Sequence, residues 1–253
     1  GLLAHTYNTP ANDVTGDGNT VTGTGRYCGG ITAYRDYRNG YNAYRFTGRN
    51  MNITGKNEVG GLYGYGGAYT SSIYDSTVNS TGGGEYVGGI GGRTSYEAEN
   101  TQLASNVTIN ANANYVGGLY GWARHLYGGT VKHCIINQTN VNKSYVGGAI
   151  GIHDGYTHNN MGVSDTTITN AGNYTGGIEG RINGGALLEY SFTSNVVING
   201  KSYVGGAAGS GTTARLYRNV TNVNITATGD YVGGVFGYIS SVHESDSNYS
   251  AVV

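Results

Sequence analysis

Five carboxylates are the first candidates for acid–base chemistry in this chain. Asp154, Asp165 and Glu179 fall in consecutive segments of the sequence, and Glu97 and Glu99 lie one residue apart on an expected loop. Glycoside hydrolysis needs a pair of carboxylates at a fixed separation. None of these acids has a partner arginine or lysine at a readable spacing. We therefore expect scattered surface acids, and we predict that the protein is not an enzyme.

Four histidines would have to converge on one point to bind a metal. Histidine is a common metal ligand, but no cysteine or further carboxylate completes a ligand set by its spacing. We expect solvated loop histidines, no metal site and no other cofactor. The residues concerned are His125, His133, His153 and His158.

Six tyrosines recur at a nearly constant spacing and are the main candidates for a binding surface. If equivalent residues stack, their rings form a ladder. An outward ladder would be a flat amphipathic stripe that packs on sugars or on another protein. An inward or half-buried ladder would only stabilise the stack. The sequence leaves both alternatives open for Tyr86, Tyr115, Tyr145, Tyr174, Tyr203 and Tyr231.

Nine asparagines precede x-Ser or x-Thr and are candidate N-glycosylation sites. Strands rich in Asn and Thr also produce such triplets without any glycan. The sites are Asn52, Asn79, Asn106, Asn137, Asn142, Asn173, Asn219, Asn224 and Asn248.

The tyrosines belong to a repeated stretch that organises the whole chain. It reads Tyr-Val-Gly-Gly-Leu-Tyr-Gly at 115–121, and two looser copies begin at Tyr27 and Glu58. The first glycines of the pairs fall at 29, 60, 88, 117, 147, 176, 205 and 233. A period so constant over so many copies indicates stacked repeats that bury their apolar faces against one another.

Each copy is followed by a variable segment and then by a β-branched stretch such as Asn106–Ile109, and helical periodicity is absent. We predict an all-β fold, a right-handed parallel β-solenoid (β-helix) of about seven to eight turns of roughly 29 residues each. Residues 1–26 would be an N-terminal cap or a donated strand, and residues 27–253 a single repeat solenoid domain.

The glycine pair poses a geometric question. The valine before it and the aliphatic residue after it are both apolar, yet they are three residues apart and would face opposite sides of a straight strand. We favour a bend at the glycines that turns both side chains inward and the tyrosine outward. The alternative is a straight strand with the tyrosine facing the core.

Composition restricts the partners. The net charge is -1, charged residues make up 11% of the chain, and no basic run occurs, which argues against nucleic acid. No apolar run approaches the roughly 20 residues of a membrane helix, so we expect no membrane insertion. Cys28 and Cys134 lie too many repeats apart to pair, and we predict two free, buried thiols.

The Val-Gly-Gly-Leu-x-Gly core of the repeat, clearest at 59–64 and 116–121, resembles the GLUG-motif repeats of bacterial surface proteins. The resemblance covers about residues 27 to 240. It implies an extracellular or cell-surface module that is stalk-like or adhesive. The tyrosine before the valine is not part of that resemblance.

Two classes of function follow, and a third is more distant. The first is an extracellular structural protein that assembles head to tail into a filament, because both chain ends are uncharged and offer unpaired strand edges. The second is a surface adhesin that recognises glycan or protein along its tyrosine ladder. The third is a polysaccharide-active β-helix enzyme.

Overall fold

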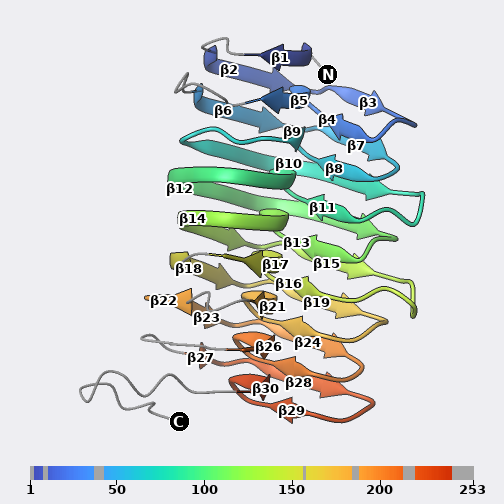
Figure 1. The fold of residues 1–253 in the computed structure, drawn as a ribbon, viewed down its shortest axis with the longest axis vertical. Coiled ribbons are helices and arrows are strands. Elements are labelled where there is room, and N and C mark those ends of the chain that lie inside the picture. Colours follow the sequence, from blue (N-terminus) through green and yellow to red (C-terminus); the bar gives the residue numbers. More distant parts are fainter. Residues whose placement is uncertain are drawn as a thin grey trace.

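A computed structural model of the protein describes residues 3–7, 11–36, 43–155, 158–183, 188–212 and 220–240. Over these residues the chain is all-β, without a helix. It winds into a parallel β-solenoid of about seven turns that recur about every 29 residues, as the sequence predicted (Figure 1).

The repeated Tyr-Val-Gly stretches form one sheet of eight short parallel strands. Each strand pairs with its equivalents in the neighbouring turns, so that Val87 lies opposite both Val59 and Val116. This register aligns equivalent residues in columns along the solenoid, about 4.8 Å apart. The strands are β4 (Tyr27–Gly29), β8 (Glu58–Gly60), β11 (Tyr86–Gly88), β13 (Tyr115–Gly117), β16 (Val146–Gly147), β20 (Thr175–Gly176), β25 (Val204–Gly205) and β29 (Val232–Gly233).

The remaining 22 strands form a second sheet that continues around each turn. Its pairings are parallel throughout, again between one turn and the next. The strands are β1 (Leu3–Tyr7), β2 (Ala11–Asp17), β3 (Thr20–Thr22), β5 (Thr32–Asp36), β6 (Ala43–Arg49), β7 (Asn52–Gly55), β9 (Tyr63–Tyr65), β10 (Ser71–Ser80), β12 (Gly91–Ala111), β14 (Tyr120–Lys132), β15 (Ile135–Gln138), β17 (Ile150–Asp154), β18 (His158–Ser164), β19 (Thr167–Asn170), β21 (Glu179–Asn183), β22 (Leu188–Glu189), β23 (Phe192–Ser194), β24 (Val197–Gly200), β26 (Ala208–Gly211), β27 (Val220–Thr221), β28 (Asn224–Ala227) and β30 (Phe236–Ile239).

The N-terminal segment belongs to the same stack. Strands β1, β2 and β3 pair with β5, β6 and β7 of the following turn. They make a first turn that lacks a Tyr-Val-Gly strand. The C-terminal stretch 250–253, which the sequence suggested as an edge strand, lies outside the described residues.

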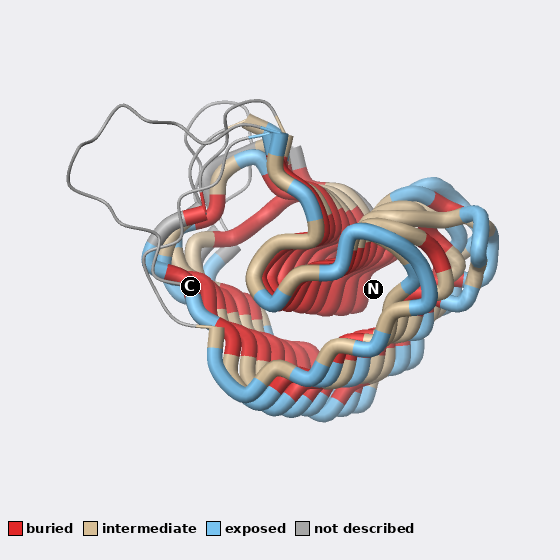
Figure 2. The backbone as a smooth tube through the Cα atoms, turned by 90° about the horizontal axis from the view of Figure 1, so that it is seen from below, coloured by how far each residue is buried: buried red, intermediate tan, exposed pale blue. Residues whose placement is uncertain are grey.

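The chain bends at the glycine pair, and both apolar positions of the motif point into the core, as expected. Val116 and Leu119 are fully buried, and β13 ends at Gly117 before the chain turns into β14. Viewed along the solenoid, buried residues recur at the same places in successive turns (Figure 2). A Cβ on Gly117 would lie 2.2 Å from the Tyr120 carbonyl oxygen, and one on Gly118 would lie 2.2 Å from the Gly148 carbonyl oxygen. These positions are glycine because the neighbouring backbones leave no space for a side chain.

Another corner of each turn is made by polar residues in the left-handed backbone conformation, with φ between 48° and 56°. Asn and Asp tolerate this conformation better than other residues with side chains. Their side chains also link adjacent turns: Asn106 Nδ2 donates to Asp75 Oδ1 at 2.7 Å. The polar corner consists of Asn50, Asp75, Asn106, His133, Asp165, Asn195 and Asn222.

Glu97 and Glu99, expected on a loop, lie instead within β12, which is 21 residues long. The expectation was wrong because backbone pairing continues through the variable segment, where Glu97 lies opposite His125 of the next turn. Parallel pairing needs only the register of the backbone, so the side chains there are free to vary.

Candidate functional site

The six repeated tyrosines stack on one another along the solenoid, outside the core. Successive ring centroids lie 4.5–5.3 Å apart, and successive ring planes differ by 11–18°. Five of the residues are half-buried, and Tyr231, nearest the C-terminus, is 53% exposed. We call this set the tyrosine ladder: Tyr86, Tyr115, Tyr145, Tyr174, Tyr203 and Tyr231.

Stacking determines which part of each ring a ligand can reach. Each inner ring covers the faces of its neighbours, so the ladder offers ring edges and hydroxyls rather than a flat stripe of ring faces. Burial raises the pKa of Tyr86, Tyr115 and Tyr174, mainly through desolvation. These hydroxyls are therefore protonated at neutral pH and can donate. The ladder is a row of hydrogen-bonding groups repeated at about the strand spacing.

Four consecutive ladder residues have a strained backbone. The φ angles of Tyr145, Tyr174, Tyr203 and Tyr231 are 57–68°. A bulky residue is an outlier in this region, at a cost of order 1–3 kcal/mol, and such strain concentrates at functional sites. Asparagine, which the chain uses at its polar corner, would adopt the same conformation more readily.

A second column of mostly large side chains runs beside the ladder, at the position after the third glycine of the motif. That glycine lies against the backbone of the preceding turn: a Cβ on Gly180 would be 2.6 Å from the Val146 nitrogen. Arg181 is thereby held against the ladder, and its Nη1 donates to Tyr145 Oη at 3.1 Å. The second column contains Tyr34, Tyr65, Arg93, Trp122, Ile152, Arg181, Ser210 and Tyr238.

The ladder and the second column together form what we call the aromatic face. Arg93 joins the two columns, because its guanidinium carbon lies 4.5 Å from the Trp122 ring centroid and 5.4 Å from that of Tyr86. Both distances fall within the range of cation–π attraction. Sequence reasoning missed this second column, since its residue types do not repeat.

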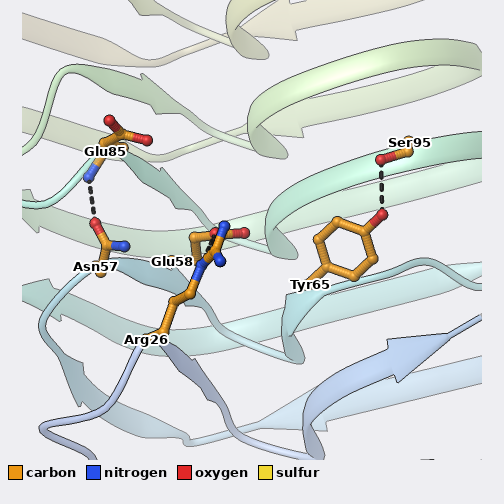
Figure 3. A network of polar contacts seen from close by, with 6 residues as sticks. All are labelled: Arg26, Asn57, Glu58, Tyr65, Glu85 and Ser95. Atoms are coloured by element: carbon orange, nitrogen blue, oxygen red, sulfur yellow. Dashed lines mark hydrogen bonds and ion pairs between the residues drawn. The ribbon is translucent and has the colours of Figure 1, made fainter.

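Glu58 takes the ladder position in the turn before Tyr86, and it is buried. Arg26 Nε donates to Glu58 Oε1 at 2.9 Å, and Tyr65 of the second column shares a hydrogen bond with Ser95 at 2.8 Å (Figure 3). Desolvation raises the pKa of Glu58, and the bond to Arg26 opposes that rise. The ladder of adjacent rings therefore begins at Tyr86.

The aromatic face is hollowed near its C-terminal end. In the second column the small Ser210, only 5% exposed, lies between Arg181 and Tyr238. A hollow of about 370 Å³ lies here, where the column lacks a large side chain. Three ladder residues line it from the other column, namely Tyr174, Tyr203 and Tyr231.

The structure does not bring the predicted acids and histidines together into a metal site. Among the described residues, no group of three or more His, Cys, Asp or Glu side chains could hold a metal ion. His133 and Asp165 belong to the polar corner, Asp154 is exposed, and His125 packs near Tyr127. The side chains of Glu97, Glu99 and His158 lie outside the described part of the chain.

His153 and Glu179 depart from expectation. Both were predicted to be solvated, and both are fully buried, with His153 Nδ1 at 3.2 Å from Glu179 Oε2. Both side chains point into the core from adjacent turns and form a hydrogen bond with each other there. Burial excludes solvent from the pair, so it is part of the core rather than of the aromatic face.

The candidate glycosylation sites occupy different environments. Asn142 is exposed in a turn, and Asn106 belongs to the polar corner. Asn79 and Asn137 lie in one asparagine column through Asn110, which bonds to both at 3.1–3.2 Å. Asn52 lies opposite Thr77 of the next turn, Asn173 is half-buried and Asn224 is exposed, while Asn219 and Asn248 lie outside the described residues.

No family model, curated protein or solved structure matches this chain. Within the described residues, no helix has the length and apolar character needed to cross a membrane. A function for the aromatic face therefore has to be inferred from the geometry of its residues.

Proposed function

We propose that this solenoid is a binding module, displayed outside the cell, that recognises an extended polysaccharide along its aromatic face. The observation that carries the proposal is the tyrosine ladder, whose rings repeat every 4.5–5.3 Å and lie at the surface. A ligand with a similar repeat would meet an equivalent hydroxyl and ring edge at each step. An extended chain of sugars offers such a repeat.

The chemistry of the face suits carbohydrate. Sugars combine hydroxyl groups with apolar C–H surfaces, and a tyrosine edge offers a polar tip beside an apolar ring. Trp122 and Tyr238 add aromatic surface in the second column, and Arg93 and Arg181 add hydrogen-bond donors.

The backbone strain favours function over simple stabilisation. Each inner ring gains two stacking contacts, worth about 0.5–1.5 kcal/mol apiece, and four ladder residues lose a similar amount through their positive φ angles. A ladder that only stabilised the fold would bring little net gain. A ligand that bonds to the tyrosine hydroxyls would account for tyrosine at these strained positions.

Display outside the cell is supported by the resemblance of the repeat to GLUG-motif surface proteins. Assembly into a fibre is a second candidate, favoured by one observation. Strands β4 and β29 are the two edges of the eight-stranded sheet, each paired on one side only among the described strands. Such edges can template head-to-tail pairing between copies.

The test is binding to a panel of immobilised plant, algal and bacterial polysaccharides. Tyr174→Asn combined with Tyr203→Asn keeps the left-handed backbone but removes two rings, and we expect at least a tenfold loss of affinity. Tyr190→Asn is the matched control, because Tyr190 also has positive φ (49°) but lies outside the aromatic face. The proposal is wrong if the unaltered protein binds none of these polymers, or if the ladder variant binds as well as the control.

A further inference from the structure

We propose that the hollow at Ser210 is a subsite for one acidic sugar, a uronic acid, whose carboxylate binds Arg181. The inference depends on the proposed polysaccharide function and names the class of polysaccharide: one that carries carboxylates.

The shape of the hollow fits a single sugar. Its volume of about 370 Å³ falls within the range of small-molecule sites, roughly 300–1,000 Å³. Ser210, which is 5% exposed, lines it together with the stacked Tyr174 and Tyr203, and Arg181 and Tyr238 flank Ser210 along the second column. A polymer following the ladder would pass directly over this opening.

Arg181 is positioned to receive an anion. Its guanidinium is fixed by the hydrogen bond to Tyr145 Oη at 3.1 Å and lies 5.6 Å from the Tyr145 ring centroid. A guanidinium has five N–H donors in a planar fork, and the bond to Tyr145 uses one of them. Within the described part of the chain, Arg181 has no ion pair. Its charge is thus available to a ligand in the hollow.

The other groups of the hollow match the rest of a sugar ring. Tyr238 is 44% exposed, and its ring stands at 89° to that of Tyr203 and 79° to that of Tyr231. It therefore presents aromatic surface that the face-to-face ladder rings do not. Thr212 and Ser240 also line the hollow and are residue types that form hydrogen bonds with sugar hydroxyls.

A carboxylate fits better than a sulfate ester. The planar guanidinium fork pairs in a bidentate manner with a planar carboxylate. A densely sulfated polymer would need a run of cations, whereas the chain has a net charge of -1 and the hollow holds a single arginine.

The experiment is calorimetric titration with oligogalacturonate and oligomeric alginate, and with the same oligomers after reduction of their carboxyl groups. We expect Arg181→Gln to weaken binding of the acidic oligomers at least tenfold and to leave the weaker binding of the reduced oligomers unchanged. Ser210→Tyr should fill the hollow and have a similar effect, because tyrosine already occupies the adjacent register position 238. Arg49→Gln, an exposed arginine stacked on Tyr74, is the matched control.

The outcomes separate the two levels of the proposal. Equal affinity for acidic and reduced oligomers, unchanged affinity in Arg181→Gln, or equally tight binding of dextran sulfate would overturn the uronate subsite while polysaccharide binding stands. Failure of every polysaccharide to bind would overturn both. If Ser210→Tyr melts early by circular dichroism, Arg181→Gln and the reduced oligomers still decide the question.

Discussion

Tyr63 and Tyr120 lie two turns apart, yet their hydroxyls are 2.9 Å from each other inside the core. Gly91 occupies the register position between them, and a Cβ there would lie 2.8 Å from both rings. Because Gly91 has no side chain, the two tyrosine rings fill the space beside it and their hydroxyls can meet. Tyr120 Oη also bonds to Gln102 Oε1 at 3.3 Å, and Gln102 Nε2 donates to the Ala68 carbonyl at 3.0 Å.

Tyr120→Phe should lower the free energy of unfolding by about 1–3 kcal/mol, because it leaves buried groups of Tyr63 and Gln102 without this partner. Tyr127→Phe removes a hydroxyl from a residue that is 39% exposed and should stay within about 0.5 kcal/mol. Urea denaturation followed by circular dichroism measures both. Equal effects would mean that the buried network adds no stability.

The register of the solenoid could be predicted from the glycine spacing alone, because stacked turns of constant length align equivalent residues. The inward direction of Val116 and Leu119 also followed from their types and the glycines between them. The long strand β12 could not be predicted, since the variable segments carry no periodic pattern and pair through the backbone.

The candidate site was only half predictable. The tyrosine ladder repeats as a residue type, so the sequence displays it. The second column holds Arg93, Trp122 and Arg181 at equivalent positions, and only the close approach of the third glycine shows that they lie beside the ladder. His153 and Glu179 lie in adjacent turns, and the residues at equivalent positions in the other neighbouring turns are apolar. No repeated residue type in the sequence therefore predicts that the two side chains pair.

The glycine pair gives a sharp prediction for stability. Gly118→Ala places a Cβ 2.2 Å from the Gly148 carbonyl oxygen and should cost about 3 kcal/mol or more, since backbone must move. Gly234→Ala is the matched control: it is the same motif position in the last turn, where an added Cβ meets nothing within 4 Å. We expect it to change stability by less than about 0.5 kcal/mol. Similar melting temperatures for the two variants would contradict the packing argument.

Cys134 should make stability fall at alkaline pH. Both cysteines are free and buried, as predicted, and desolvation raises the pKa of Cys134 from 9.0 to about 11. Between these values the unfolded thiol has lost its proton while the folded one keeps it, so raising the pH favours unfolding. The stabilisation is complete below pH 9 and is lost as the pH approaches 11, a change of about 2–3 kcal/mol.

Cys134→Val isolates this contribution, because Val107 and Val196 hold the equivalent position after the polar corner in other turns. Under reducing conditions, the denaturation midpoint of the wild type should fall further between pH 8 and pH 11 than that of Cys134→Val, because only the wild type has the Cys134 thiol. Identical losses in both proteins would show that the thiol does not titrate in this window.

The buried pair of His153 and Glu179 should behave differently when broken and when replaced. The register neighbours of His153 are Ala123 and Ile182, and those of Glu179 are Ile150 and Ala208, all fully buried. His153→Leu alone removes the Nδ1 partner of Glu179 Oε2 inside the core and should destabilise by about 1–3 kcal/mol.

Replacing both partners by leucine continues the apolar columns on either side of the pair. Because a buried polar pair often contributes little beyond its own desolvation cost, the double variant should recover to within about 1 kcal/mol of the wild type or exceed it. A double-mutant cycle by urea denaturation measures the coupling. If the double variant is as unstable as the sum of the single variants, the two side chains act independently and the contact at 3.2 Å carries no coupling.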